Sequence, residues 1–245
     1  MFRRIVVAAA VLVLTGLAVT PASASAQPAA QPPVAAGTSS CAAIRALLPI
    51  AGDGNYVLNT GSHLVPVYCH DMAGTPREYI TLTAPNFSQY TAGGATQGTN
   101  VRTTFTRVRI DPATLLVDIN DVTFATSTGS ALQSGNFAIG SMPYGVAASC
   151  DFAASGVGRV DLGGTAFVLA ASWVLGGFES RGGATLSADG RSADLAGGGY
   201  CGSLTPAPAI YNPVNPTVPD FHLQLACGPH TLVDVLLGRA CVNLT

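Results

Sequence analysis

The sequence predicts a single β-rich domain of antiparallel sheets with two short helices, stapled by disulfide bonds. Three observations support this fold class. Short β-branched and aromatic runs recur along the chain, separated by turns rich in Gly, Asp and Pro. Apolar residues make up 48% of the 245 residues, which is enough for a sizeable core. Six cysteines follow a segment typical of exported proteins, and an oxidising compartment favours three disulfides whose pairing the count leaves open.

Residues 1–26 have the pattern of a secretory signal peptide. Two arginines precede the apolar stretch Ile5–Val19, and Ala24–Ala26 is a cleavage site of the A-x-A kind. We expect cleavage after Ala26; retention of this segment as a membrane anchor is the alternative. The rest of the chain has no second apolar run long enough to span a bilayer. The sequence therefore predicts a secreted, extracellular protein without a membrane span in its mature form.

A linker and one folded domain are expected to follow the signal peptide. Residues 27–40 are rich in Pro, Ala, Gln and Ser, which is typical of a flexible or semi-extended linker. Residues 41–245 are expected to fold in one piece. Ser39 or Ser40 can cap a helix at Cys41–Leu48, where apolar residues recur at helical spacing before Pro49.

The pattern then changes to strands and remains so for most of the chain. A second short helix is expected only at Thr231–Leu237, followed by Gly238 as a C-cap. Long loops at Tyr90–Asn100 and Pro206–Pro219 are candidates for a binding surface, because loops on β scaffolds often carry function. The expected strands are Asn55–Asn59, Val65–Cys69, Glu78–Leu82, Thr103–Ile110, Leu115–Ile119 with Val122–Ala125 as its continuation, Arg159–Leu162, Ala166–Trp173, Thr185–Leu186 and Ser192–Leu195.

Two of these segments carry sharper local signals. Thr103–Ile110 alternates, so Phe105, Arg107 and Arg109 are expected on one face, with Val108 and Ile110 on the other. Asp189-Gly190 is a strong hairpin signal between the last two expected strands.

Composition excludes several classes of function. All 11 basic residues are arginines and the net charge is −2, which disfavours nucleic-acid binding through a basic surface. Without lysine the chain has neither a Schiff-base lysine nor a P-loop lysine. Neither HExxH nor GxSxG occurs, so the zinc site of many peptidases and the hydrolase nucleophile elbow are missing. Gly197–Gly202 matches GxGxxG, but it opens no expected helix and is interpreted as a chance match.

Two groups of residues could bind metal, although no cofactor is expected. His222, Cys227 and His230 lie close together and could hold zinc; alternatively, Cys227 and Cys241 close a small disulfide loop and leave two surface histidines. Asp118, Asn120 and Asp121 resemble the start of a calcium loop, but the central Gly and terminal Glu of such loops are missing, so a turn is the other interpretation.

Two N-glycosylation sequons occur, Asn86-Phe87-Ser88 and Asn243-Leu244-Thr245. The Ala- and Gly-rich composition without lysine is typical of a bacterial protein, in which we expect neither to be used.

Several motifs in order along the chain resemble the GON domain, the C-terminal domain of certain secreted ADAMTS-type metalloproteases. The resemblance covers residues 41–206. It departs from the family at Leu204, where a second cysteine of the "YCGxC" pattern would stand, and it does not cover Ala207–Thr245. The matching segments are Cys41–Leu82, Asn86–Tyr90 ("NFSxxY"), Arg107–Asp111 ("KIRID"), Asp121–Ala125 ("DLQFA"), Gly158–Trp173 ("GRFSINL … GTG … W") and Gly198–Pro206 ("GGYCGxCTP").

The first of these segments is also similar to the opening of fibrinogen-like domains, in which its two cysteines are bonded. That similarity implies a Cys41–Cys69 disulfide. Proximity then suggests Cys227–Cys241 and leaves Cys150 for Cys201.

What the GON resemblance implies about function is a non-catalytic module. In the larger proteins the peptidase activity resides in a separate domain with its own HExxH, which this chain lacks. We therefore expect a secreted interaction or adhesion module that binds an extracellular protein or glycan. The alternative is a zinc-binding, metalloendopeptidase-associated protein, and a wall-associated protein without a specific ligand is a third possibility.

Overall fold

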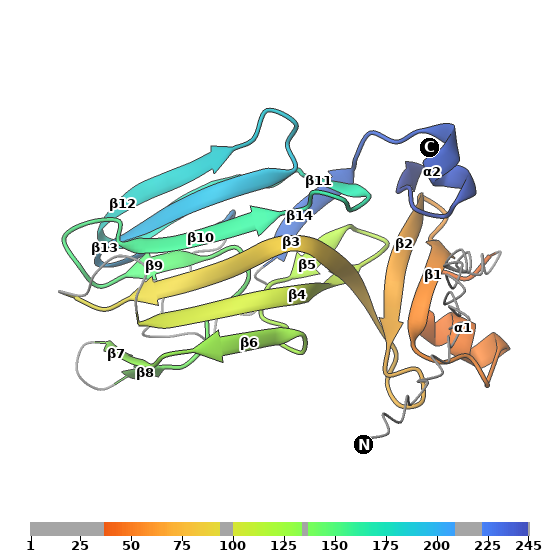
Figure 1. Cartoon of the computed structure of the whole chain (residues 1–245), viewed down its shortest axis with the longest axis horizontal. Helices are drawn as coiled ribbons and strands as arrows, with labels where there is room; N and C mark the ends of the chain where they lie inside the picture. Colours follow the sequence, from red (N-terminus) through yellow and green to blue (C-terminus); the bar gives the residue numbers. More distant parts are fainter. Residues whose placement is uncertain (1–36, 94–99, 134–136, 209–221, 245) are drawn as a thin grey trace, which may run out of the picture. The chain divides into compact units, whose positions relative to one another are not determined.

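A computed structural model describes residues 37–93, 100–133, 137–208 and 222–244 (Figure 1). The predicted signal peptide at residues 1–26 and most of the predicted linker at residues 27–40 lie outside the described residues. No helix among the described residues has the length and apolar character needed to cross a membrane.

The described residues confirm a β-rich fold with two short helices. The helices are α1, Cys41–Leu47, and α2, Leu232–Leu236. The strands in chain order are β1 Gly54–Asn59, β2 His63–His70, β3 Arg77–Thr91, β4 Val101–Asp111, β5 Leu116–Asp118, β6 Ala125–Thr128, β7 Ala131–Gln133, β8 Phe137–Ile139, β9 Ala147–Ser149, β10 Gly156–Asp161, β11 Phe167–Leu169, β12 Trp173–Leu186, β13 Ser192–Pro206, β14 His222–Cys227 and β15 Val242–Asn243.

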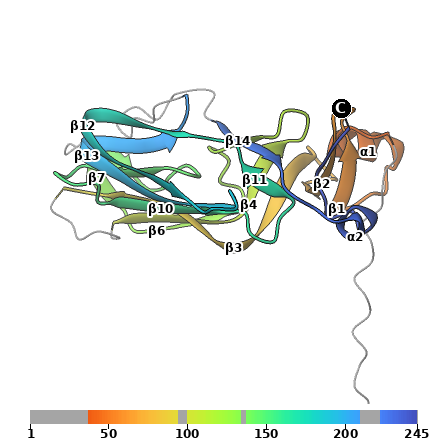
Figure 2. The same cartoon turned by 90° about the horizontal axis from the view of Figure 1, so that it is seen from above.

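Thirteen of the described strands belong to one sheet, and β7 and β8 form a separate pair. The main order is β10-β13-β9-β3-β4-β5-β14-β11, with β12 paired to β13, β6 to β4, and the β1–β2 hairpin joined to β3. All pairs are antiparallel except β3–β9. β12 and β13 lie side by side in both views (Figures 1 and 2). The long strand β3 connects the β1–β2 hairpin to the region of β9 and β10.

Local chemistry explains where the helices and turns occur. Ser40 caps α1 by accepting a hydrogen bond from the Ala43 N–H, and Thr231 with Asp234 forms a reciprocal capping box at α2. Gly190 adopts φ +67° in the predicted Asp189-Gly190 turn, a conformation that suits glycine, and this turn joins β12 to β13. Both helices and this hairpin therefore stand where the sequence predicted them.

Three disulfides join Cys41 to Cys69, Cys150 to Cys201 and Cys227 to Cys241. This is the pairing that the resemblance and the proximity of the last two cysteines suggested. A disulfide stabilises mainly by restricting the unfolded chain, at roughly 2–4 kcal/mol each. The third bridge ties the end of β14 to the segment before β15, so the C-terminal part outside the motif resemblance is built into the same sheet.

The alternation predicted for β4 is present, but the buried face changes along the strand. Val101, Thr103 and Phe105 are buried in its first half, whereas Val108 and Ile110 are buried in its second half. The change coincides with a register irregularity in the partner strand between Thr81 and Asn86. Phe105 therefore shares a face with Arg107 and Arg109, yet only Phe105 is covered, by the ring of Tyr144.

Several element predictions were wrong in extent; the last two expected strands, for example, run over Trp173–Leu186 and Ser192–Pro206. Tyr90 was expected to begin a loop but lies fully buried in β3, because strand pairing continues through Thr91. Val122–Ala125 does not continue β5; it is a turn up to Phe124, and β6 then pairs with β4. Ala166–Trp173 is not one strand, since β11 pairs with β14 whereas Trp173 begins β12.

The loops proposed as binding surfaces lie largely outside the described residues. The residues outside are 94–99 of the predicted loop Tyr90–Asn100 and 209–219 of the predicted loop Pro206–Pro219. Gly197–Gly202 lies within β13 and precedes no helix, and a Cβ at Gly197 would collide with the backbone of Ala147. These glycines thus serve close backbone packing.

Candidate functional site

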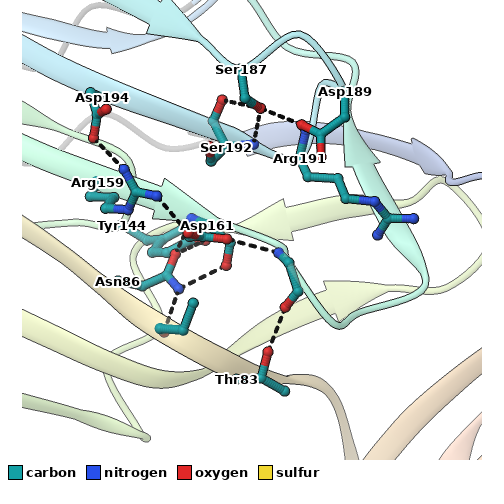
Figure 3. Close-up of polar contacts among 12 residues, drawn as sticks. Thr83, Asn86, Tyr144, Arg159, Asp161, Ser187, Asp189, Arg191, Ser192 and Asp194 are labelled. Atoms are coloured by element: carbon teal, nitrogen blue, oxygen red, sulfur yellow. Dashed lines mark hydrogen bonds and ion pairs between the residues drawn. The ribbon is translucent and has the colours of Figure 1, made fainter.

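Two motifs of the GON resemblance meet in a polar network that runs from buried Asn86 and Tyr144 to the surface, the Asn86 network (Asn86, Tyr144, Asp161, Arg159 and Asp194; Figure 3). β3 and β10 pair side by side, which brings Asn86-Phe87-Ser88 against Gly158–Leu162. Asn86 is fully buried. Its amide nitrogen donates to the carbonyls of Ala84 and Asp161, both at 2.9 Å, and its Oδ1 accepts from the Asp161 N–H at 2.7 Å and the Tyr144 hydroxyl at 2.9 Å.

The ionised groups of the Asn86 network are paired as well. The Arg159 guanidinium lies 2.7 Å from a carboxylate oxygen of both Asp161 and Asp194, and these bonds raise the pKa of Arg159. Complete burial raises the pKa of Tyr144 far above its ordinary value, so this phenol remains neutral. Every polar atom of Asn86 is occupied, and the network therefore holds β3, β10 and β13 together rather than exposing a reactive group.

Burial of Asn86 also makes its glycosylation sequon inaccessible in the folded domain. The side-chain amide that would carry a glycan is 0% exposed and donates two hydrogen bonds to backbone carbonyls. In the second sequon, Asn243 is exposed in β15, whereas Thr245 lies outside the described residues.

A second group of polar residues lies on an open face of the sheet. One cross-strand row runs over five strands, because directly paired residues share a face: Tyr68 on β2, Tyr79 on β3, Arg109 on β4, Asp118 on β5 and His222 on β14. The opposite face is entirely core, with Val67, Ile80, Val108, Val117 and Leu223 each at most 3% exposed. The sheet thus has one buried apolar face and one face of polar and aromatic side chains in this region, on which Tyr79 lies against Phe124 and is only 2% exposed.

The open face carries an arginine–aromatic cluster, formed by Tyr68, His70, Tyr79, Arg107 and Phe124. The Phe124 ring lies edge-on to the rings of Tyr68, His70 and Tyr79, with centroid separations of 6.2, 4.8 and 4.8 Å. Phe124 comes from the turn before β6, so this contact holds that turn over β2 and β3. The cluster shares Tyr68 and Tyr79 with the cross-strand row that continues to Arg109 and Asp118.

Arg107 is the cation of this cluster. Its guanidinium carbon lies 3.9 Å from the centroid of the Tyr68 ring and 4.7 Å from that of Phe124, and its Nε donates to the Thr81 hydroxyl at 3.1 Å. No carboxylate among the described residues forms an ion pair with it. The side chain is half-buried, and the two rings and the Thr81 hydroxyl hold its guanidinium in one place.

Two aspartates, Asp53 and Asp121, border the cluster, and each accepts hydrogen bonds from it or from the adjoining loop. Asp53 lies 2.8 Å from His70 Nδ1 and accepts hydrogen bonds from the N–H groups of Met72 and Asp71, and the Met72 bond contributes most to a lowered pKa of Asp53. On the other side the Tyr79 hydroxyl donates to Asp121 at 3.1 Å, and burial raises the pKa of this tyrosine. The acids therefore order the loops around the rings.

The predicted start of a calcium loop has a different arrangement from a cation site. Arg109 lies 3.4 Å from Asp118 and 4.0 Å from Asp121. The other carboxylate oxygens of these residues accept the backbone N–H groups of Asn120 and Thr123. A guanidinium thus stands where a calcium ion would be required, and the segment forms a turn.

The structure does not bring the three zinc candidates together as a ligand set. Cys227 is bonded to Cys241, so it offers no thiolate. His222 stands at the start of β14 beside Asp118, whereas His230 follows the end of β14 and its Nδ1 lies 3.2 Å from the Gly228 carbonyl. Among the described residues, no group of three or more His, Cys, Asp or Glu side chains could hold a metal ion.

A third feature is an exposed apolar ring patch of Phe152, Phe178 and Tyr200, which are 66%, 71% and 38% exposed. Tyr200 lies between the other two rings, with centroids 4.4 Å from Phe152 and 6.2 Å from Phe178. The backbone beneath is irregular, since β12 has register shifts on both sides of Phe178. Glu179 and Cys201 adopt φ +46° and +60°, a costly conformation for side chains other than glycine that often marks functional positions.

Sequence reasoning did not single out Tyr144, Phe124 or the rings of the patch. These residues are far apart in the sequence and no spacing connects them. The alternation of β4 was the available signal for the open face, since charged Arg107 and Arg109 alternate with apolar Val108 and Ile110.

Comparison with known proteins identifies one family. Residues 38–100 and 91–212 match the family described as the GON domain, and this match covers both segments of the Asn86 network and the cluster on β2–β4. Searches of curated proteins and of solved structures gave no match. GON domains are non-catalytic modules of an extracellular type, which agrees with the three disulfides. Because the match extends over most of the chain, this protein belongs to the GON-domain family.

Proposed function

We propose that this chain is exported and acts as a non-catalytic module that binds an extracellular glycan or protein through the arginine–aromatic cluster. The observation that carries the proposal is the position of Arg107: its guanidinium is held by Tyr68, Phe124 and Thr81 and forms no ion pair within the described residues. A surface cation that its own domain orders but does not neutralise is suited to a ligand anion.

The surroundings of Arg107 indicate the chemistry of that ligand. A guanidinium presents paired N–H groups that match a carboxylate or sulfate, and aromatic rings beneath it strengthen the contact. Thr81, exposed beside it, can exchange hydrogen bonds with hydroxyl or amide groups. We therefore propose an acidic group on the ligand, supplied by a uronate or sulfated sugar or by an acidic segment of a protein.

Export is part of the same proposal. It rests on the signal-peptide pattern of residues 1–26, the linker composition of residues 27–40 and the three disulfides. The linker would separate the domain from the surface to which the N-terminus is exported. The metalloendopeptidase alternative has no observation in its favour, because the disulfide of Cys227 removes the only thiolate of the zinc candidates.

Binding to an array of neutral, uronate-containing and sulfated oligosaccharides, together with acidic and neutral peptides, tests the proposal. Arg107→Gln is the test variant. Arg102→Gln is its matched control, since Arg102 lies on the same strand and stacks on the ring of Phe87 at 3.5 Å, but on the other face. We expect binding to acidic probes that weakens with salt, a loss of about 10-fold or more in Arg107→Gln, and no change in Arg102→Gln.

Two results would contradict this assignment. If only neutral probes bind, the anionic ligand is wrong. If both arginine variants lose affinity equally, the cluster on β2–β4 is not the binding surface.

A further inference from the structure

The open face of the sheet carries a second arginine whose charge is not neutralised, Arg77 at the start of β3. Side chains alternate along a strand, so Arg77 lies on the same face as Thr81, and it is paired directly with His70 on β2. The Arg77 side chain is exposed, and its Nη1 donates to the Pro76 carbonyl at 3.1 Å. It forms no ion pair within the described residues. Arg77 and Arg107 are therefore two unneutralised cations on one face.

The carboxylates around the arginine–aromatic cluster are engaged elsewhere. Asp53 lies 2.8 Å from His70 and accepts hydrogen bonds from two backbone N–H groups. Asp118 and Asp121 lie 3.4 and 4.0 Å from Arg109, the third arginine of this face. An acidic group of a ligand can therefore pair with either unneutralised arginine without displacing an ion pair of the protein.

The separation between the two cations follows from the strand register. Arg107 is paired with Thr81, which stands four residues after Arg77 on β3. The Arg107 guanidinium leans over Tyr68, which is the strand partner of Tyr79. Tyr79 is only two residues from Arg77. Two to four strand residues span roughly 7–13 Å, and one two-sugar unit of an extended glycan covers a distance in this range.

Aromatic rings occupy the space between the two cations. The Phe124 centroid lies 4.7 Å from the guanidinium carbon of Arg107 and 4.8 Å from the centroid of His70. His70 in turn stands opposite Arg77. The order across the face is therefore cation, two rings, cation. Both rings are partly exposed, so the C–H face of a sugar can pack on them through dispersion contacts.

We propose that the ligand of this face is a linear glycan that carries an acidic group on every second sugar. Arg107 and Arg77 bind two successive acidic groups, and the neutral sugar between them lies over Phe124 and His70. The contact at Arg77 rests on the proposed function, in which Arg107 binds the first acidic group. Two contacts on one molecule bind more tightly than either alone, because the second forms at a high effective concentration.

An alternating glycan suits this face better than an acidic peptide does. Its order of acidic, neutral and acidic sugars repeats the order of cation, rings and cation. An extended peptide can hold two carboxylates at a similar separation, but it places a polar backbone over the rings where a sugar places C–H groups. The backbone groups of the peptide would then lose water without gaining hydrogen-bond partners.

Three trisaccharides of equal length test the spacing, since they differ only in where glucuronate stands. Their orders are acidic–neutral–acidic, neutral–acidic–neutral and acidic–acidic–neutral. We expect calorimetric titration of the purified, processed chain to show about 10-fold or tighter binding of the first than of the second. The third should bind much as the second does, because its acidic groups are adjacent and cannot reach both arginines.

Arg77→Gln separates the two contacts. It should lower the affinity for the acidic–neutral–acidic probe about 10-fold, to that of the neutral–acidic–neutral probe. The affinity for the latter should stay unchanged, which also shows that the variant is folded. Arg107→Gln should weaken binding of all three probes. Arg181→Gln is the matched control, because it removes an exposed arginine of β12 without an ion pair in the described residues, and it should change none of them.

Three results would overturn the proposal in different ways. Equal binding of the first two trisaccharides, still abolished by Arg107→Gln, would remove the second contact and leave the proposed function intact. Binding of the peptide Glu-Ser-Ser-Ser-Glu but of no trisaccharide would show that the ligand class is wrong. If no acidic probe binds, the second contact and the proposed function both fail.

Discussion

The Asn86 network and the arginine–aromatic cluster both combine tyrosine, arginine and aspartate, yet they use these residues in opposite ways. In the Asn86 network, Arg159 is neutralised by two carboxylates and Asn86 has a partner for every polar atom. In the cluster, Arg107 rests on two rings without a described carboxylate partner, and one side of the sheet remains open.

For Asn86 and Tyr144 the difference follows from complete burial, which separates folding residues from candidate functional ones in this protein. A buried polar group without a partner costs free energy, so the interior keeps only groups that satisfy one another. Such residues are essential for the fold and have no capacity left for a ligand. At the half-exposed open face water can satisfy the guanidinium, and a ligand can later replace that water. Motif residues in Asn86–Tyr90 thus act in folding, whereas Arg107 of a neighbouring motif remains available for binding.

The largest expected effect is on the Asn86 network. Asn86→Ala removes the partners of a buried phenol, two carbonyls and one N–H, so we expect a loss of about 3–4 kcal/mol in the free energy of unfolding. Urea denaturation measures it. The control Asn120→Ala, at an exposed turn position, should change stability by less than about 0.5 kcal/mol. Equal losses of stability at both positions would contradict the conclusion that the Asn86 network stabilises the fold more than an exposed polar residue does.

Tyr144→Phe should cost less, about 1–1.5 kcal/mol, because Asn86 Oδ1 keeps its bond from the Asp161 N–H. The variant should also respond differently to alkali. Burial raises the pKa of Tyr144 in the folded state. Its contribution to the free energy of unfolding is therefore complete below the unfolded-state pKa of about 10 and declines as the pH rises above that value. Urea titrations at neutral and alkaline pH should show a smaller decline in Tyr144→Phe, and an identical decline would contradict the burial argument.

Arg107→Gln should affect ligand binding more than stability. Loss of the two ring contacts should lower the free energy of unfolding by no more than about 1 kcal/mol, close to the effect of Arg102→Gln. Thermal unfolding of both variants measures this. A loss as large as that of Asn86→Ala would mean that Arg107 is primarily a folding residue.

The smallest expected effect concerns Asp53. Its pKa is lowered chiefly by the Met72 N–H, so its contribution to stability is present above the ordinary carboxyl pKa and is lost as the pH falls through the lower folded-state pKa. Asp53→Asn should therefore lower the stability slightly at neutral pH and reduce the further loss of stability below about pH 4. Acid titration by NMR of the Asp53 carboxyl provides the direct measurement, and a pKa at or above the ordinary value would contradict the hydrogen bonds to Asp71 and Met72.

Local signals in the sequence predicted those parts of the fold that depend on neighbouring residues. Ser40, the Asp189-Gly190 turn and the Thr231 cap act within a few residues, so the helices and the β12–β13 hairpin could be located from them. Predictions failed where a strand is maintained by distant partners. β3 continues past Leu82 to Thr91 because β4, β10 and β9 pair with it, and β9 and β10 lie far from it in the sequence.

By itself the sequence determined the β-rich class, the pattern of an exported protein, the resemblance to GON domains and the alternation that separates Arg107 and Arg109 from the core. These depend on composition, order and short-range periodicity. Only the tertiary structure decided that Asn86 is closed off, that Asp118 and Asp121 turn to Arg109, and that Phe152, Phe178 and Tyr200 share one surface. The physical reason is that burial and charge pairing are properties of groups brought together from separate strands, and no local pattern encodes which strands will meet.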